Sequence, residues 1–311
     1  MKTHEINKFF IKAVDLATQY RGATSPNPPV AAIGIDKDGN ELSIKAHEKA
    51  GLPHAEVYVI EDCKNKGLLD RLHTLIVTLE PCNHAGKTPP CTKAILNTNI
   101  KRVIIGTSDP NPKVNGNGVK TLREAGLEVI ENICTSECES LIMPFKKWIT
   151  TGLPWVTLKS AYSVDGNMIP PSGKKTFSSN ESLLFAHKLR KRADAILTGS
   201  GTILKDFPEF TVRLVPDHIN KIRWLCILDR RQRVPTEYIE QKKAQGFKVL
   251  LSKDYIDALR YLGKQDCLEV LVEAGPTLLK WILESNIWDE HYIIKVKENQ
   301  DVIEHALRYT L

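Results

Sequence analysis

Hydrophobic and polar positions in the first half of the chain follow two patterns. A period of three to four residues over 5–20 predicts an amphipathic helix, with apolar positions at Ile6, Phe9, Phe10, Ala13, Val14 and Ala17. Short apolar runs predict buried strands at 30–35, 75–79 and 103–106, and helices are predicted at 54–63 and 91–96. We therefore expect an N-terminal α/β layer domain.

The second half alternates strands with helices. Apolar runs of strand length occupy residues 155–159, 194–199, 222–229, 247–252 and 268–273, and helices are predicted at 180–192 and up to residue 283. This alternation favours a mostly parallel sheet. Pro144, Gly152 and Pro154 punctuate a short connection between the halves. We predict domains of residues 1–150 and 151–311.

Composition narrows the class of protein. A chain of 311 residues with 42% hydrophobic and 26% charged residues is ordinary for two globular domains. The net charge of +6 suits an anionic small substrate or cofactor, and the lack of a like-charge block argues against a nucleic-acid partner. No apolar run has the length of a signal peptide or a membrane span, and the seven cysteines are scattered, so we expect a cytoplasmic protein.

The most specific chemistry lies at His54, Cys82 and Cys91. One imidazole and two thiolates give a tetrahedral Zn²⁺ three protein ligands and leave its fourth position open for water. Glu56, two residues after His54, is predicted to move a proton from this water to a leaving amine without binding the metal. The pattern therefore predicts hydrolytic deamination of a nucleobase-like ring.

Two other interpretations of the cysteines stay open: a closed structural zinc site at Cys82 and Cys91, and a second metal site at Cys134 and Cys138. In the compact deaminase signature two residues separate the cysteines, whereas Cys91 follows Cys82 by nine positions. His84 inside this expanded loop is a candidate fourth ligand of a closed structural zinc site. Cys134 and Cys138 are four residues apart, and we expect ordinary thiols there rather than a second metal site.

Two glycine-containing segments at predicted strand ends suggest a dinucleotide site in the second half. They are Gly199-Ser200-Gly201-Thr202 and Glu273-Ala274-Gly275-Pro276-Thr277, whose backbone amides can face phosphate oxygens. The ordinary Gly-x-Gly-x-x-Gly fingerprint is absent. Asp206 and Arg213, downstream of the first segment, are either ligand contacts or solvated surface groups.

Taken together, these motifs resemble the bifunctional deaminase/reductase family of riboflavin biosynthesis. The matching stretches are 24–28, 50–57, 78–82, 86–91, 109–112, 163–166, 172–173, 189–213 and 272–277. The resemblance covers about residues 5–290. It implies a cytidine-deaminase-like α/β/α layer domain followed by a dihydrofolate-reductase-like α/β domain.

The resemblance implies two successive reactions. A zinc-dependent hydrolytic deamination of 2,5-diamino-6-ribosylamino-4(3H)-pyrimidinone 5′-phosphate precedes NADPH-dependent reduction of the ribosyl side chain to ribityl. It also implies a homo-oligomer that binds a small phosphorylated pyrimidine, whereas the expectation of no nucleic-acid and no membrane partner rests on the composition given above. Asn27 would lie in the pyrimidine pocket. Residues implied for NADPH are Ser163, Thr202, Asp206, Gly275, Pro276 and Thr277, and those implied for the substrate are Lys174, Arg190, Phe210, Arg213 and Glu273.

The chain departs from the family pattern in three places. About twenty residues follow Asp289-Glu290, where the family usually continues through another strand pair, so the end of the sheet is expected to be missing or rebuilt. Pro29-Val30-Ala31 and Phe207 replace more usual residues and are expected to be tolerated. The alternatives are a deaminase with an impaired reductase, a nucleic-acid deaminase or binding module, and a structural zinc protein or scaffold.

Overall fold

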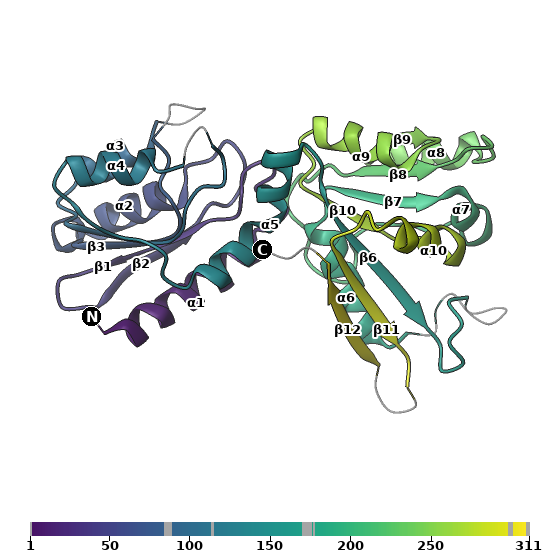
Figure 1. Cartoon of the computed structure of the whole chain (residues 1–311), viewed down its shortest axis with the longest axis horizontal. Coiled ribbons are helices and arrows are strands. Elements are labelled where there is room, and N and C mark those ends of the chain that lie inside the picture. Colours follow the sequence, from purple (N-terminus) through teal and green to yellow (C-terminus); the bar gives the residue numbers. More distant parts are fainter. Residues whose placement is uncertain are drawn as a thin grey trace. The chain divides into compact units, whose positions relative to one another are not determined.

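The computed structural model describes residues 2–83, 89–112, 115–169, 176, 178–297 and 301–308. The chain forms two compact units, Met1–Thr151 and Gly152–Leu311 (Figure 1). The domain boundary predicted from Pro144, Gly152 and Pro154 lies at residue 150, and the chain divides into the two units between Thr151 and Gly152. Each unit has its own sheet and its own hydrophobic core.

The described part of the first unit is built on a sheet with the order β2-β1-β3-β4-β5. The strands are β1 (Ala31–Ile35), β2 (Glu41–Ala46), β3 (Thr74–Leu79), β4 (Arg102–Thr107) and β5 (Glu128–Ile130). β1 pairs antiparallel with β2 and β3, whereas β3, β4 and β5 run parallel. Every residue of β1 and β3 is buried, which explains their unbroken apolar runs.

Helices cover both faces of this sheet. They are α1 (Thr3–Gln19), α2 (Ala55–Asn65), α3 (Cys91–Leu96), α4 (Asn117–Glu124) and α5 (Thr135–Thr151), with a short 3₁₀ turn at Leu69–Arg71. Ile33 packs in one core with α1 and α5, whereas its neighbour Ala32 packs in another with α2, α3 and α4. Successive residues of a strand point to opposite faces, so the predicted α/β/α layering is confirmed.

The described part of the second unit has the sheet order β12-β11-β6-β10-β7-β8-β9. The strands are β6 (Trp155–Tyr162), β7 (Ala195–Gly199), β8 (Trp224–Leu228), β9 (Lys248–Ser252), β10 (Glu269–Val272), β11 (Glu290–Lys295) and β12 (Val302–Leu307). All pairs are parallel except β11 with β12. The predicted, mostly parallel sheet is therefore confirmed.

Helices also cover both faces of the second sheet. They are α6 (Asn180–Arg192), α7 (Ser200–Asp206), α8 (Thr236–Ala244), α9 (Tyr255–Lys264) and α10 (Pro276–Ser285). Side chains of α9 and α10 share a core with Leu197 of β7, whereas α7 and α8 share a core with the adjacent Ile196. None of the helices in the described parts of the chain has the length and apolarity that a bilayer crossing requires.

The C-terminal end of the second sheet corrects one expectation. The end of the sheet, expected to be missing or rebuilt, is not missing: β11 pairs with β6 and with β12, whose register runs from Glu290↔Leu307 to Lys295↔Val302. Every residue of β12 is exposed. Because the apolar residues of such an edge strand do not alternate cleanly with polar ones, the sequence pattern did not reveal it.

Candidate active sites

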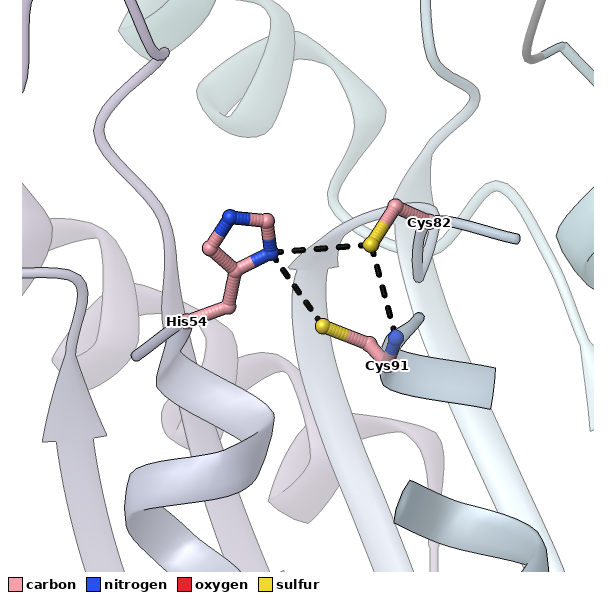
Figure 2. A group of neighbouring side chains, drawn as sticks. All are labelled: His54, Cys82 and Cys91. Atoms are coloured by element: carbon pink, nitrogen blue, oxygen red, sulfur yellow. Dashed lines mark hydrogen bonds between the residues drawn. The ribbon is translucent and has the colours of Figure 1, made fainter. Parts of the chain in front are cut away.

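His54, Cys82 and Cys91 come together in the first unit (Figure 2). His54 is the N-cap of α2, Cys91 opens α3, and Cys82 follows the end of β3. His54 Nδ1 lies 3.2 Å from Cys91 Sγ and 3.6 Å from Cys82 Sγ, and Nδ1 points toward both sulfurs. All three ligand atoms lie within 4.8 Å of one another.

This donor set fits Zn²⁺. With Zn–N and Zn–S bonds of ordinary length, donors on one tetrahedral ion lie about 3.5 Å apart, close to both nitrogen–sulfur distances. A hydrogen bond from Cys91 lowers the pKa of Cys82 to about 4, so that a thiolate is favoured there. His84, the candidate fourth ligand, lies outside the described residues. Among the described residues, these three form the group suited to a metal.

Glu56 lies beside the ligands on the first turn of α2 and is 3% exposed. Burial raises the pKa of its carboxyl above the ordinary value, although the neighbouring His54 opposes the rise. A carboxyl whose pKa is raised takes up a proton more readily than an ordinary one, as a group in general acid–base catalysis must.

Asn27 is connected to this group through His47, which sequence reasoning missed. The Nδ1–H of His47 donates to the Pro53 carbonyl at 3.0 Å, so its Nε2 accepts from Asn27 Nδ2 at 3.1 Å. The His47 and His54 rings meet edge to face, with centroids 5.2 Å apart. Burial lowers the pKa of His47 to about 4, which keeps the ring neutral. Its place seven residues before the candidate ligand His54 was the available signal.

The pair Cys134 and Cys138 shows no sign of a metal site among the described residues. Cys138 lies on α5 and is fully buried in the core of the first unit. Burial raises the pKa of its thiol to about 12, and that of Cys134 is raised for the same reason.

The second unit contains a cavity of about 1380 Å³ along the carboxyl ends of its parallel strands. It brings together nine of the residues implied by the family resemblance, namely Arg190, Thr202, Asp206, Phe210, Arg213, Glu273, Gly275, Pro276 and Thr277. Ser163 is not among the described lining residues. It lies in a turn, where its Oγ accepts the Asn167 N–H at 3.1 Å. Lys174 lies outside the described residues.

Glu273, which directly follows β10, is the charged centre of this cavity. Its carboxylate accepts from Arg190 Nε at 2.5 Å and Nη2 at 2.9 Å, and Lys159 Nζ lies 3.3 Å away. Burial by itself would raise the pKa of Glu273, but the charges of Arg190 and Lys159 outweigh it and lower the pKa to about 2. Sequence reasoning missed Lys159, since its strand gave no sign of chemistry.

The segment that carries Phe210 and Arg213 is held against α6. Arg190 Nη1 donates to the Thr211 carbonyl at 3.3 Å and its guanidinium lies over the Phe210 ring, 6.0 Å from the centroid. His187 Nδ1 accepts the Arg213 N–H at 3.0 Å. Phe207 and Phe210 have φ of +41° and +57°, a region that bulky residues rarely adopt. These contacts hold a strained backbone in place at the cavity wall.

The two glycine-containing segments are joined to each other. Thr202 Oγ1 accepts the Gly275 N–H at 3.0 Å, and a Cβ on Gly275 would lie 3.4 Å from this oxygen. The carboxyl ends of β7 and β10 are thereby fixed side by side at the cavity. This arrangement leaves the Gly275-Pro276-Thr277 backbone close to any ligand that fills it.

One end of the cavity carries a basic cluster that sequence reasoning missed. It consists of Arg230, Arg231, Arg233 and Lys253, which follow β8 and β9. Arg233 Nη2 donates to Ser200 Oγ at 3.3 Å, and Arg230 Nε donates to the Lys253 carbonyl at 3.0 Å. Several guanidinium groups on one wall favour a phosphate-bearing ligand.

Comparison with known proteins supports both halves. Residues 3–107 match the family profile described as "Cytidine and deoxycytidylate deaminase zinc-binding region", and residues 154–296 match the "RibD C-terminal domain". The riboflavin biosynthesis protein RibD of Aquifex aeolicus is 38% identical over an alignment 309 residues long. This alignment covers 92% of this chain and 85% of that protein. The chain belongs to the RibD family.

Solved structures agree with RibD membership. The Thermotoga maritima structure described as a diaminohydroxyphosphoribosylaminopyrimidine deaminase/5-amino-6-(5-phosphoribosylamino)uracil reductase is 34% identical and aligns with a TM-score of 0.84, over 94% of this chain and 87% of that one. Acinetobacter baumannii RibD gives a TM-score of 0.81 at 31% identity, over 95% and 87%. The predicted family and fold are confirmed: a zinc-dependent deaminase and an NADPH-dependent reductase of riboflavin biosynthesis share this chain.

Proposed function

We propose that the first unit deaminates a ribosylated diaminopyrimidinone 5′-phosphate and that the second unit reduces the ribosyl group of the product to ribityl with NADPH. The observation that carries the proposal is the convergence of His54, Cys82 and Cys91 beside the buried Glu56. The substrate follows from the description of the Thermotoga maritima structure, which is 34% identical. The charged cavity of the second unit supports the second step.

In the deaminase, His54, Cys82 and Cys91 would hold the metal. Bound Zn²⁺ supplies Lewis acidity and lowers the pKa of water, which makes a nucleophile available at neutral pH. The Glu56 carboxylate takes a proton from the attacking water and delivers it to the departing amine nitrogen. Asn27 Nδ2 is committed to His47, so the atom of Asn27 that would contact the pyrimidine ring is Oδ1, as an acceptor from a ring N–H.

In the reductase, hydride transfer requires no protein nucleophile, so the cavity has to bind and orient two anionic molecules. Glu273 neutralises Arg190 and fixes its guanidinium plane. Arg213 is exposed at the cavity and is suited to the phosphate of the substrate. The cluster around Arg233 is suited to the additional phosphate that distinguishes NADPH from NADH.

The alternative of an impaired reductase rested on an incomplete sheet. β11 and β12 are present, and β11 pairs with β6 from Glu290↔Thr157 to Lys295↔Tyr162. Lys159, which contacts Glu273, lies within this paired stretch of β6. β11 therefore supports the strand that carries Lys159, and we favour an active reductase.

The test uses purified, zinc-replete protein with the diaminopyrimidinone ribosyl phosphate, with and without NADPH. Ammonia release and NADPH absorbance are followed together, with Glu56→Gln as the matched control that blocks the first step. We expect ammonia first and NADPH consumption afterwards. Ammonia release without NADPH consumption would overturn the reductase assignment. The absence of both signals would overturn the whole proposal.

Two further expectations stay predictions, a homo-oligomeric assembly and a cytoplasmic location without nucleic-acid partners. Sedimentation equilibrium would give the oligomeric state, and a monomer at micromolar concentration would contradict the predicted homo-oligomer. Retention of labelled RNA on a filter, measured over a range of salt concentrations, tests the absence of nucleic-acid binding.

A further inference from the structure

Glu80 is a buried carboxylate that neither proposed reaction uses. It follows β3 directly and is 3% exposed. Its Oε1 accepts the N–H groups of Gly118 and Val119 at 3.0 and 3.3 Å. Its Oε2 accepts those of Gly116 and Asp109 at 3.0 and 3.3 Å. One side chain thus satisfies four backbone donors from the start of α4 and the end of β4.

Gly118 brings the same backbone onto the turn that carries a metal ligand. A Cβ added to Gly118 would lie 2.1 Å from the Pro81 carbonyl oxygen and 3.2 Å from Glu80 Oε1. Only glycine allows this approach without movement of the chain. The first turn of α4 therefore rests directly on the peptide that joins Pro81 to Cys82.

Asn83 fixes the other side of Cys82. Its Oδ1 accepts from Thr92 Oγ1 at 2.7 Å, and its Nδ2 donates to Thr121 Oγ1 at 2.8 Å. The Cys91 N–H donates to Cys82 Sγ at 3.4 Å, a contact that Figure 2 shows beside His54. Cys82 thus lies between α3 and α4, with Asn83 bridging the two helices.

We propose that Glu80 is a positioning residue of the metal site. Its carboxylate holds α4 on the Pro81 peptide and thereby fixes Cys82 Sγ relative to His54 and Cys91. Only a group with acceptors on both arms can satisfy all four N–H groups. An amide at this position turns its NH₂ toward two of these donors, which are then left unpaired and repelled. The inference rests on the proposed zinc site.

The test compares Glu80→Gln with Glu124→Gln, a matched control on α4 whose carboxylate is 66% exposed. The Zn²⁺ dissociation constant is measured by competition with a chromogenic chelator, and the Co²⁺-substituted protein gives the visible spectrum of the ligand field. Changes to groups that orient metal ligands weaken binding by about 10- to 100-fold. We expect that loss and a shifted Co²⁺ spectrum for Glu80→Gln, and wild-type values for Glu124→Gln.

A second variant keeps the inference testable if Glu80→Gln fails to fold. Gly118→Ala leaves the carboxylate intact but displaces the Pro81 peptide, so it should weaken Zn²⁺ binding and shift the Co²⁺ spectrum in the same direction. A folded Glu80→Gln or Gly118→Ala protein with wild-type affinity and spectrum would overturn the positioning role alone. A wild-type chain that binds no Zn²⁺ would overturn the proposed function and this role with it.

Discussion

Replacing Glu273 with Gln should destabilise the second unit in a manner that depends on pH. The substitution preserves the size of the side chain and removes its charge. Arg190, 13% exposed at its side chain, and Lys159 then lose the carboxylate that compensates their burial. Removing one partner of a buried ion pair is costly because the other charge stays buried, typically by about 3 to 5 kcal/mol.

The lowered pKa gives a second value for the same effect. The pKa of Glu273 falls from its ordinary 4.5 to about 2, and each pKa unit corresponds to about 1.4 kcal/mol, so the charged form contributes about 3 kcal/mol. Because the folded-state pKa is depressed, this stability is present above the unfolded-state value of 4.5. It is lost as the pH falls from 4.5 toward 2. The cost of an unpaired buried charge and the pKa shift of Glu273 therefore give similar values, about 3 kcal/mol, for the effect of the substitution.

Urea unfolding followed by tryptophan fluorescence measures the effect, because four of the five tryptophans, all except Trp148, lie in the second unit. At pH 7 we expect Glu273→Gln to lower the free energy of unfolding by about 3 kcal/mol, and at pH 3.5 the difference should be smaller by roughly 1 kcal/mol. Glu240→Gln, at a 60%-exposed side chain, is the control and should change stability by less than about 0.5 kcal/mol. Equal stability at pH 7, or a difference that stays constant with pH, would refute the reasoning.

The remaining predictions concern the two active sites. Glu56→Gln should abolish ammonia release while zinc content by atomic absorption stays at the wild-type level, since the role proposed for Glu56 is proton transfer rather than metal binding; loss of the metal would contradict this role. Cys82→Ser should lose both zinc and deamination, because a thiolate ligand is removed; a metal-replete, active variant would refute the assignment. Arg233→Gln should raise the KM for NADPH by about 10-fold or more and leave that for NADH unchanged, because a charged hydrogen bond to phosphate contributes about 1.5–3 kcal/mol; equal effects on both cofactors would place the additional phosphate elsewhere.

The sequence by itself determined the ligand chemistry and most of the layers. His54, Cys82 and Cys91 were identifiable as candidate ligands because few residue types bind Zn²⁺ and because Glu56 follows His54 by two residues. Strands such as β1 and β3 were visible because both of their faces are covered, which requires unbroken apolar runs. These signals are local, so that reading along the chain is sufficient to find them.

Only the tertiary structure decided which distant residues meet. Lys159, Arg190 and Glu273 form one charged group because β6 and β10 are neighbours in the sheet and α6 packs against β10. Periodicity gives the face of a strand but not its neighbours, since sheet order follows from long-range packing. The same limit hid Glu80, whose four amide partners lie 29 to 39 residues downstream. It also hid β12, whose exposed residues acquire a strand conformation only by pairing with β11.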